Sequence, residues 1–162
     1  MKIRPRIYLD TSVISHLMAD DAPEKRDDTH KLWEQLKQGD FEVVLSPVVF
    51  IEIAKCEDAL AQALNAYLGM ISTVFVEETP AMLALANEYL KTGVLKQKSI
   101  NDCRHIAIAS VSGCKYILSW YMKHFVKRKT IEMVQSVNQR LGISQPLILT
   151  PSVFIEGDEP ND

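Results

Sequence analysis

The stretch Arg6-Ile-Tyr-Leu-Asp-Thr-Ser-Val-Ile-Ser15 decides the fold class, because in it an apolar run passes directly into a helix start. Residues 6–9 fit a short buried strand. The triplet Asp10-Thr-Ser then favours the start of a helix that reaches Met18, since these side chains can satisfy the free N–H groups of a first helical turn. A buried strand followed at once by a helix is typical of an α/β protein.

Strands and helices alternate along the rest of the chain. Apolar runs predict further strands at residues 41–45, 72–76, 116–118 and 147–149. Helical spacing and capping residues predict helices at residues 27–37, 58–70, 99–111 and 130–141, with two more that begin near Pro47 and Pro80, whereas residues 19–26 are expected to form a loop. This order predicts a three-layer α/β/α sandwich with a central, mainly parallel sheet of about five short strands.

The length and composition favour one domain. A chain of 162 residues that is 47% hydrophobic can bury one substantial core but is short for two. We expect the domain to span residues 1–150. The acidic, proline-containing tail at residues 151–162 is expected to be frayed.

The cysteines and the N-terminus predict a cytoplasmic protein. Cys56, Cys103 and Cys114 are odd in number and lie far apart, which argues against a disulfide framework or a zinc site. The chain opens with basic residues rather than an apolar run, and its longest apolar stretches have the length of strands. Neither a signal peptide nor contact with a membrane is therefore expected.

The charge balance restricts how the chain could bind nucleic acid. A formal net charge of −3 does not suit a protein that coats nucleic acid, because such binding depends on neutralising phosphates with Lys and Arg. A local basic patch late in the sequence is the exception, and it contains Lys115, Lys123, His124, Lys127, Arg128 and Lys129. Such a run is more often a solvated face, but it makes Lys123, His124, Lys127 and Arg128 candidates for RNA phosphate contacts.

Three carboxylates lie where ligands gather in a parallel sheet, beyond the carboxyl ends of the strands. Asp10 ends the first strand, Glu52 lies in the helix after the second strand, and Asp102 opens the helix that leads to the fourth. Each of the two aspartates also has a structural explanation, since Asp10 fits a helix N-cap and Asp102 stands three residues after Ser99 in a plausible capping box.

Glu52 is harder to explain as a structural residue. It is the only charged residue in Pro47-Val-Val-Phe-Ile-Glu-Ile-Ala54, and an ionised carboxylate in apolar surroundings needs a cation or a metal. Lys55 lies close in sequence, and we identify no committed basic partner. Three converging acids without such a partner suggest a site for Mg²⁺ or Mn²⁺, which bind carboxylate and water oxygens.

Four blocks of the sequence together resemble the PIN-domain family, which includes VapC-like toxin nucleases of bacterial toxin–antitoxin pairs. The blocks occur in the order and spacing of that family over nearly the whole chain. They are Tyr8-Leu-Asp-Thr-Ser-Val-Ile-Ser15, the isolated Glu52, Asn101-Asp-Cys-Arg-His-Ile-Ala-Ile-Ala109 and Leu118-Ser-Trp-Tyr-Met-Lys-His-Phe-Val126.

The resemblance implies a metal-dependent ribonuclease. Asp10 and Asp102 match acids that bind one or two divalent ions, and Glu52 matches an acid that holds a metal-bound water or acts as a base. Thr11 and Ser12 would line the floor of the acidic pocket. In the usual mechanism the ion activates a water for attack on a phosphodiester and offsets charge on the phosphate.

The chain departs from the family pattern at Tyr121, where related proteins carry Asp or Asn. A neutral phenol is a poor ligand for Mg²⁺, so this departure disfavours a second metal position. Ser119 could supply a hydroxyl there, and Tyr121 could hydrogen-bond a metal-bound water. His105 stands three residues after Asp102 and could touch the pocket, although a structural role is the more common one for such a histidine.

Two hypotheses about function follow from these residues. The first is a Mg²⁺- or Mn²⁺-dependent endoribonuclease, the toxin of a pair whose small antitoxin protein holds its activity in check. The second is a degenerate PIN domain that has lost turnover and serves as an RNA-binding or protein-interaction module. A nucleotide-binding domain is disfavoured, because the chain contains no glycine-rich phosphate loop. Apolar helices at residues 58–70 and 79–91, together with the family resemblance, predict a homodimer.

Overall fold

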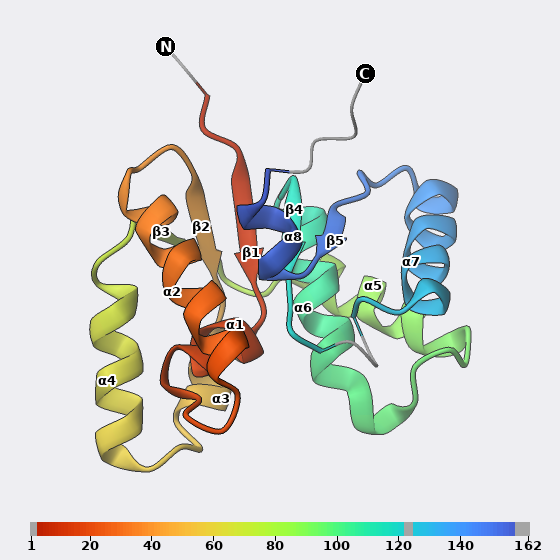
Figure 1. The fold of residues 1–162 in the computed structure, drawn as a ribbon. Helices are drawn as coiled ribbons and strands as arrows, with labels where there is room; N and C mark the ends of the chain where they lie inside the picture. The colour runs from red at the N-terminus through yellow and green to blue at the C-terminus, as the bar shows by residue number, and fades with distance from the viewer. Residues whose placement is uncertain (1–2, 122–124, 158–162) are drawn as a thin grey trace.

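The computed structural model describes residues 3–121 and 125–157. Five short parallel strands form one sheet in the order β3-β2-β1-β4-β5 (Figure 1). The strands are β1 (Arg6–Leu9), β2 (Glu42–Leu45), β3 (Thr73–Phe75), β4 (Tyr116–Leu118) and β5 (Leu147–Leu149). The predicted strand positions are confirmed, with β1, β4 and β5 matching to the residue.

The helices cover the sheet in two packed groups, which gives the expected α/β/α sandwich. α5 packs against α6 and α7, and α2 packs against α8. The helices are α1 (Thr11–Ser15), η1 (His16–Met18), α2 (Pro23–Lys37), α3 (Pro47–Ile53), α4 (Asp58–Leu68), α5 (Pro80–Lys91), η2 (Gln97–Ser99), α6 (Ile100–Val111), α7 (Arg128–Leu141) and α8 (Pro151–Ile155). No helix in the described ranges is long and apolar enough to cross a membrane.

The structure departs from the predicted pattern at the start of α2 and at the start of the tail. α2 begins at Pro23 rather than after the predicted loop at 19–26, because proline suits the first turn of a helix, where its missing N–H costs nothing. The tail predicted to be frayed instead starts with α8, whose Thr150 Oγ1 accepts a hydrogen bond from Val153 N at 3.3 Å. α8 also packs on α2, and the Ser152 hydroxyl donates to Asp28 at 2.7 Å. These contacts give the start of the tail a packing partner.

The sheet and the inner faces of the helices form one hydrophobic core. Ile7, Tyr8 and Leu9 of the central strand are fully buried, as expected for a strand covered on both faces. Trp33 of α2 is also buried, and its indole N–H donates to the Tyr67 carbonyl at 2.9 Å. Because all strands run in one direction, their carboxyl ends meet at one edge of the sheet, where the polar residues described next are found.

Candidate active site

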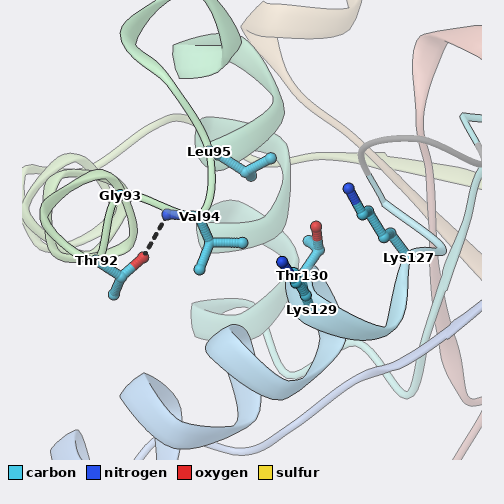
Figure 2. Close-up of a pocket in the computed structure, with 7 residues that line it drawn as sticks. All are labelled: Thr92, Gly93, Val94, Leu95, Lys127, Lys129 and Thr130. Atoms are coloured by element: carbon cyan, nitrogen blue, oxygen red, sulfur yellow. Dashed lines mark hydrogen bonds between the residues drawn. The ribbon is translucent and has the colours of Figure 1, made fainter.

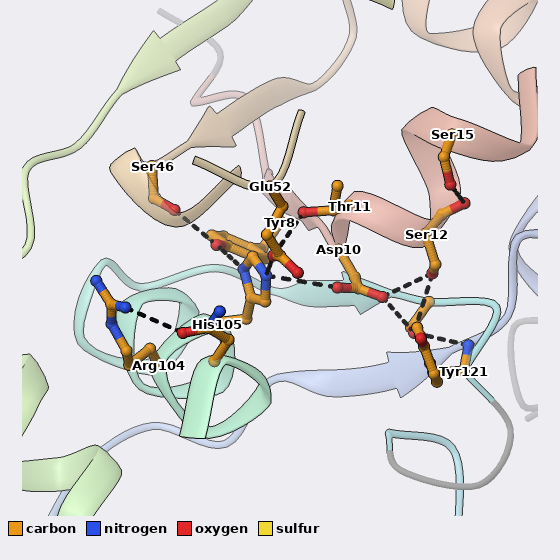
Figure 3. A network of polar contacts seen from close by, with 12 residues as sticks. Tyr8, Asp10, Thr11, Ser12, Ser15, Ser46, Glu52, Arg104, His105 and Tyr121 are labelled. Atoms are coloured by element: carbon orange, nitrogen blue, oxygen red, sulfur yellow. Dashed lines mark hydrogen bonds and ion pairs between the residues drawn. The ribbon is translucent and has the colours of Figure 1, made fainter. Parts of the chain in front are cut away.

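Asp10 leaves the carboxyl end of β1 and is nearly inaccessible to solvent, with an exposed fraction of 3%. Its backbone N–H donates to the Leu118 carbonyl at 3.0 Å, which fixes it beside the end of β4. Its carboxylate does not cap the following helix. Instead, Asp10 Oδ2 accepts hydrogen bonds from Ser12 Oγ at 2.6 Å and Ser119 Oγ at 2.9 Å. The side chain is therefore committed to a buried polar cluster rather than to the helix end (Figure 3).

Glu52 reaches the same cluster from α3. Its Oε1 accepts a hydrogen bond from Thr11 Oγ1 at 2.9 Å and lies 2.5 Å from His105 Nε2. The helix that carries it is not enclosed on every side, since Phe50 and Ile51 are exposed on its outer face. The expectation that Glu52 has no committed basic partner was wrong. His105 is that partner, 53 positions away in sequence.

His105 of α6 lies at the centre of the cluster and is fully buried. Its Nδ1 lies 2.5 Å from the Tyr8 hydroxyl, which in turn lies 2.8 Å from Ser46 Oγ. Its Nε2 faces Glu52 and stands 3.6 Å from Asp10 Oδ1. Both ring nitrogens therefore have partners. A doubly protonated ring that donates to Tyr8 and to Glu52, with Tyr8 donating to Ser46, satisfies the whole chain.

The surrounding acids favour the charged form of His105. Burial by itself lowers the pKa of the imidazole, but the hydrogen bond to Glu52 and the charges of Asp10, Glu52 and Asp102 raise it, and the net direction is upward. For Glu52, burial raises the pKa of the carboxyl, whereas the hydrogen bond and charge of His105 and the Thr11 hydroxyl lower it, and the net direction is downward. The two shifts agree with an imidazolium paired with a carboxylate.

The stability of the metal-free protein should depend on pH because of this pair. The raised pKa of His105 contributes stability that is complete below pH 6.5, the ordinary pKa of histidine, and is lost as the pH rises through the pKa of the folded state. The lowered pKa of Glu52 contributes stability that is complete above pH 4.5, the ordinary pKa of glutamate, and is lost as the pH falls through the pKa of the folded state. The pair should thus stabilise most between these values. Urea unfolding at a series of pH values tests this prediction in the wild-type protein and in a His105→Gln variant. If the free energies of unfolding of the two proteins changed with pH in parallel, the pair would not be the source of the pH dependence.

Asp102 lies in the first turn of α6, close enough for its charge to raise the pKa of His105. The predicted capping box with Ser99 is absent, since the Ser99 side chain makes no cap hydrogen bond to α6. Arg104, the neighbouring cation, is committed elsewhere: its guanidinium donates to both carboxylate oxygens of Glu78, at 2.9 and 2.7 Å. Arg104 therefore does not serve as the paired cation of Asp10 or Glu52.

A pocket of about 450 Å³ opens beside the cluster. It brings together several residues that the sequence singled out, and its lining consists of Thr11, Ser12, Ser15, His16, Glu52, Lys55, Cys56, Trp120 and Tyr121. Tyr121 is half exposed, and its backbone N–H donates to Ser119 Oγ at 2.9 Å. Ser119 itself is fully buried and holds Asp10. Of the predicted pocket residues, Thr11, Ser12 and Tyr121 reach the pocket, and Ser119 supports it from beneath.

The predicted phosphate contacts are only partly placed by the structure. Lys123 and His124 lie outside the described residues. Arg128 is exposed and pairs with Glu132 at 2.8 Å within α7. Lys127 is exposed too and lines a different pocket, described below.

The donor chemistry of the cluster fits a hard divalent ion. Asp10 Oδ1 and Glu52 flank His105 Nε2, and the Glu52 side chain is partly open to solvent. Carboxylate oxygens of this kind are the ligands that Mg²⁺ and Mn²⁺ prefer. Within the described ranges, however, no three His, Cys, Asp or Glu side chains stand ready to hold a metal ion. His105 takes the place of a cation between the two acids.

Sequence reasoning missed Tyr8 and Ser46 and underestimated His105. Tyr8 reads as a core residue of β1, and Ser46 reads as the N-cap of α3, although its side chain makes no cap hydrogen bond. The available signal was Glu52 itself, because a carboxylate on an apolar helix requires a cation. Of the histidines, His105 is the one nearest in sequence to another of the three acids, Asp102.

The fold and this cluster define an α/β/α protein with an acidic site at the carboxyl edge of a parallel sheet. The profile of the PIN domain family matches residues 7–119, and the chain belongs to this family. A comparison with curated protein sequences gave no match.

The solved structures that resemble the chain include two toxin–antitoxin proteins. One is VapC20 of Mycobacterium tuberculosis, a Sarcin-Ricin loop cleaving toxin, with a TM-score of 0.53 and 19% identity over 68% of this chain and 86% of that chain. The other is VapBC2 from Rickettsia felis bound to a DNA fragment from their promoter, with a TM-score of 0.55 and 12% identity over 90% of this chain and 98% of that chain. At these identities the likeness supports the fold.

Proposed function

We propose that the protein is a divalent-metal-dependent ribonuclease of the PIN type. The observation that carries this proposal is the convergence of Asp10 and Glu52 on His105 Nε2, with Asp102 close enough to act on the same ring. Three acids from three separate elements gather at the edge of the sheet where ligands bind. Glu52 lines an open pocket, where a substrate phosphate can approach, and Thr11 and Ser12 of the same pocket bond to Glu52 and Asp10.

Asp10 and Asp102 would hold the ion, and Glu52 would orient its water. When bound, a Mg²⁺ or Mn²⁺ ion makes a coordinated water more acidic and offsets charge that develops on the phosphate. Ser12 and Ser119 fix the Asp10 carboxylate by donating to Oδ2, which leaves Oδ1 directed at His105. Thr11 fixes Glu52 in the same way. These hydroxyls hold the acids in position for binding.

His105 would stabilise the acids when no ion is bound. Its imidazolium lies between Asp10 and Glu52, where two unneutralised carboxylates would repel each other. A divalent ion held by Asp10 and Asp102 would replace the imidazolium as the positive charge that offsets these carboxylates. We therefore expect ion binding to release a proton from His105 or to displace its ring from Glu52.

The pocket next to the acids suits a flexible single strand of RNA. The half-exposed ring of Tyr121 offers an aromatic face on which a base can stack, and Lys55 contributes a positive charge at the same rim. In this proposal Tyr121 contacts substrate rather than metal, which accounts for an aromatic residue at a position where related proteins carry Asp or Asn.

The cellular role that we infer is that of a toxin paired with an antitoxin. This inference is supported by family membership and by the likeness to VapC20 and VapBC2, one described as a toxin and the other solved as a pair with its promoter DNA. A small protein that covers the pocket would keep such an enzyme inactive. The homodimer expected from the sequence stays a prediction.

The proposed function is tested by cleavage of a panel of structured and single-stranded RNAs with Mg²⁺, Mn²⁺ or EDTA. We expect metal-dependent cleavage by the wild-type protein and loss of cleavage in an Asp102→Asn variant whose thermal unfolding is unchanged. The His105 ion pair also favours a second function, a binding module without turnover, because it neutralises the acids without metal. RNA binding without cleavage by the wild-type protein under any of these conditions would favour that module.

A further inference from the structure

A second pocket, of about 300 Å³, lies between the end of α5 and the first turn of α7 (Figure 2). It shares no lining residue with the pocket beside the acids. One wall is the segment 92–95, and the other is the start of α7. The lining residues are Thr92, Gly93, Val94, Leu95, Lys127, Lys129 and Thr130.

The first turn of α7 has features that favour the binding of an anion. α7 is 14 residues long, and its N-cap residue, Lys127, supplies no side-chain hydrogen bond. Its first turn contains no acidic residue. The first N–H groups of a helix have no partner within the helix, and the helix dipole places positive potential there. This end of α7 therefore lacks the capping oxygen that usually satisfies such N–H groups.

A second observation is independent of the helix end. Thr130 is fully buried, and its Oγ1 has no hydrogen-bond partner among the residues that the structure describes. Figure 2 shows this hydroxyl directed into the space between Leu95 and Lys127. Buried hydroxyls are nearly always paired, because an unpaired one has lost its hydrogen bonds to water. The Thr130 hydroxyl is thus a buried hydrogen-bonding group that is available to a ligand.

The charges of the residues that line the pocket also favour the binding of an anion. Lys127 and Lys129 are exposed and form no ion pair within the described ranges, and no carboxylate lines the pocket. Arg128, which lies between them, is instead paired with Glu132. The hydroxyl of Thr92 is already used, since it donates to the Tyr89 carbonyl at 2.7 Å. Two free ammonium groups, an unpaired hydroxyl and a bare helix start together suit a phosphate.

We propose that this pocket binds a backbone phosphate of single-stranded RNA outside the cleavage site. α7 follows β4, so its first turn lies at the edge where the parallel strands end, as does the acid cluster. The segment 92–95 leads through η2 into α6, which carries Asp102 and His105. One strand of RNA can therefore contact both places. The choice of RNA as the macromolecule rests on the proposed function. The binding of a phosphate at this pocket does not.

The first experiment uses inorganic phosphate and the full chain. Amide NMR spectra are recorded during a phosphate titration, with chloride added to the same ionic strength as a control. We expect shifts at the amides of Gly93, Lys129 and Thr130, and their loss in a Thr130→Val variant. Valine has nearly the same shape and removes a hydroxyl without a partner, so the melting temperature should stay the same or rise. Shifts spread evenly over surface lysines would overturn the proposal.

The second experiment measures RNA binding in an Asp102→Asn background with EDTA, where the RNA stays intact. Fluorescence anisotropy with a labelled single-stranded RNA should show about tenfold weaker binding for Thr130→Val and for Lys129→Ala, as expected for loss of a hydrogen bond to a charged group. The salt dependence should also decrease by about 0.7 in log–log slope for Lys129→Ala. Arg128→Ala is the matched control, because it removes a neighbouring charge that is already paired.

The outcomes separate this proposal from the proposed function. Pocket-dependent RNA binding by a wild-type protein that never cleaves RNA would support the pocket and reject the nuclease. Cleavage with RNA affinities equal in Thr130→Val, Lys129→Ala and Arg128→Ala would support the nuclease and overturn the pocket. Phosphate shifts at Thr130 without any effect on RNA affinity would overturn the assignment to RNA and indicate a site for small phosphate esters.

Discussion

Replacing His105 by alanine is expected to lower the free energy of unfolding of the metal-free protein by about 3–5 kcal/mol. The fully buried ring pairs with Glu52 and faces Asp10, so its removal leaves two carboxylates close together without a counterion. The Tyr8 hydroxyl loses its partner in the same step. Breaking a buried pair from one side is costly because the remaining charge stays desolvated.

Urea unfolding in EDTA measures this loss, and His30→Ala is the matched control. His30 makes one hydrogen bond, to the Leu17 carbonyl at 2.9 Å, so its removal should cost about 1 kcal/mol. Added Mg²⁺ should then stabilise His105→Ala more than the wild-type protein, because the acids of the variant have no competing imidazolium. Equal losses in the two variants would show that the acids do not depend on His105.

Replacing Asp10 by asparagine is expected to reduce RNA cleavage more than about 100-fold, which is the upper end of the loss seen when an outer partner of a metal ligand is removed. Asparagine keeps the shape of the side chain but removes its charge. Ser12 and Ser119 both donate to Oδ2, so the amide oxygen must turn toward them. The amide N–H groups then face His105, where a carboxylate oxygen would be needed to bind a cation.

Ser119→Ala is the graded control for that variant. It keeps the Asp10 charge but removes one of the hydroxyls that hold Oδ2, and it also frees the Tyr121 N–H. Cleavage should fall by about 10- to 100-fold, less than in Asp10→Asn. Initial rates on one RNA with saturating Mn²⁺ compare the two, with circular dichroism as the check on folding. A greater loss in Ser119→Ala than in Asp10→Asn would remove Asp10 from its proposed role.

The fold could be predicted from the sequence because the apolar runs of the sequence coincide with the buried strands of the structure. β4 and β5 are apolar runs between a turn and a helix, and both were placed to the residue. The start of α2 was placed too late because the helix begins with Pro23 and a polar first turn, where periodicity gives no signal. The helical start of the tail at 151–155 depends on packing against α2, a contact between distant parts of the chain.

The acids of the site could be predicted, but their charge balance could not. Asp10 and Glu52 were recognised because each is an acidic residue beyond the carboxyl end of a parallel strand, where ligands bind in such folds. Their common partner was not identified, because His105 is separated from Glu52 by 53 positions and from Tyr8 by 97. The role of Asp102 as a metal ligand stays a prediction. Pairings of this kind depend on which helix lies over which strand end, and the sequence gives no direct sign of that.

The central place of β1 in the sheet also affects how the protein matures. Asp10 depends on a hydroxyl that is synthesised 109 positions later, because Ser119 follows β4 and β4 pairs with β1. A chain that leaves the ribosome N-terminus first therefore presents Asp10 long before the residues that surround it exist. Parallel pairing between distant segments is slow to form. The hydrogen-bonded arrangement around Asp10 should consequently arise in a late step of folding, after the first half of the sheet has already assembled.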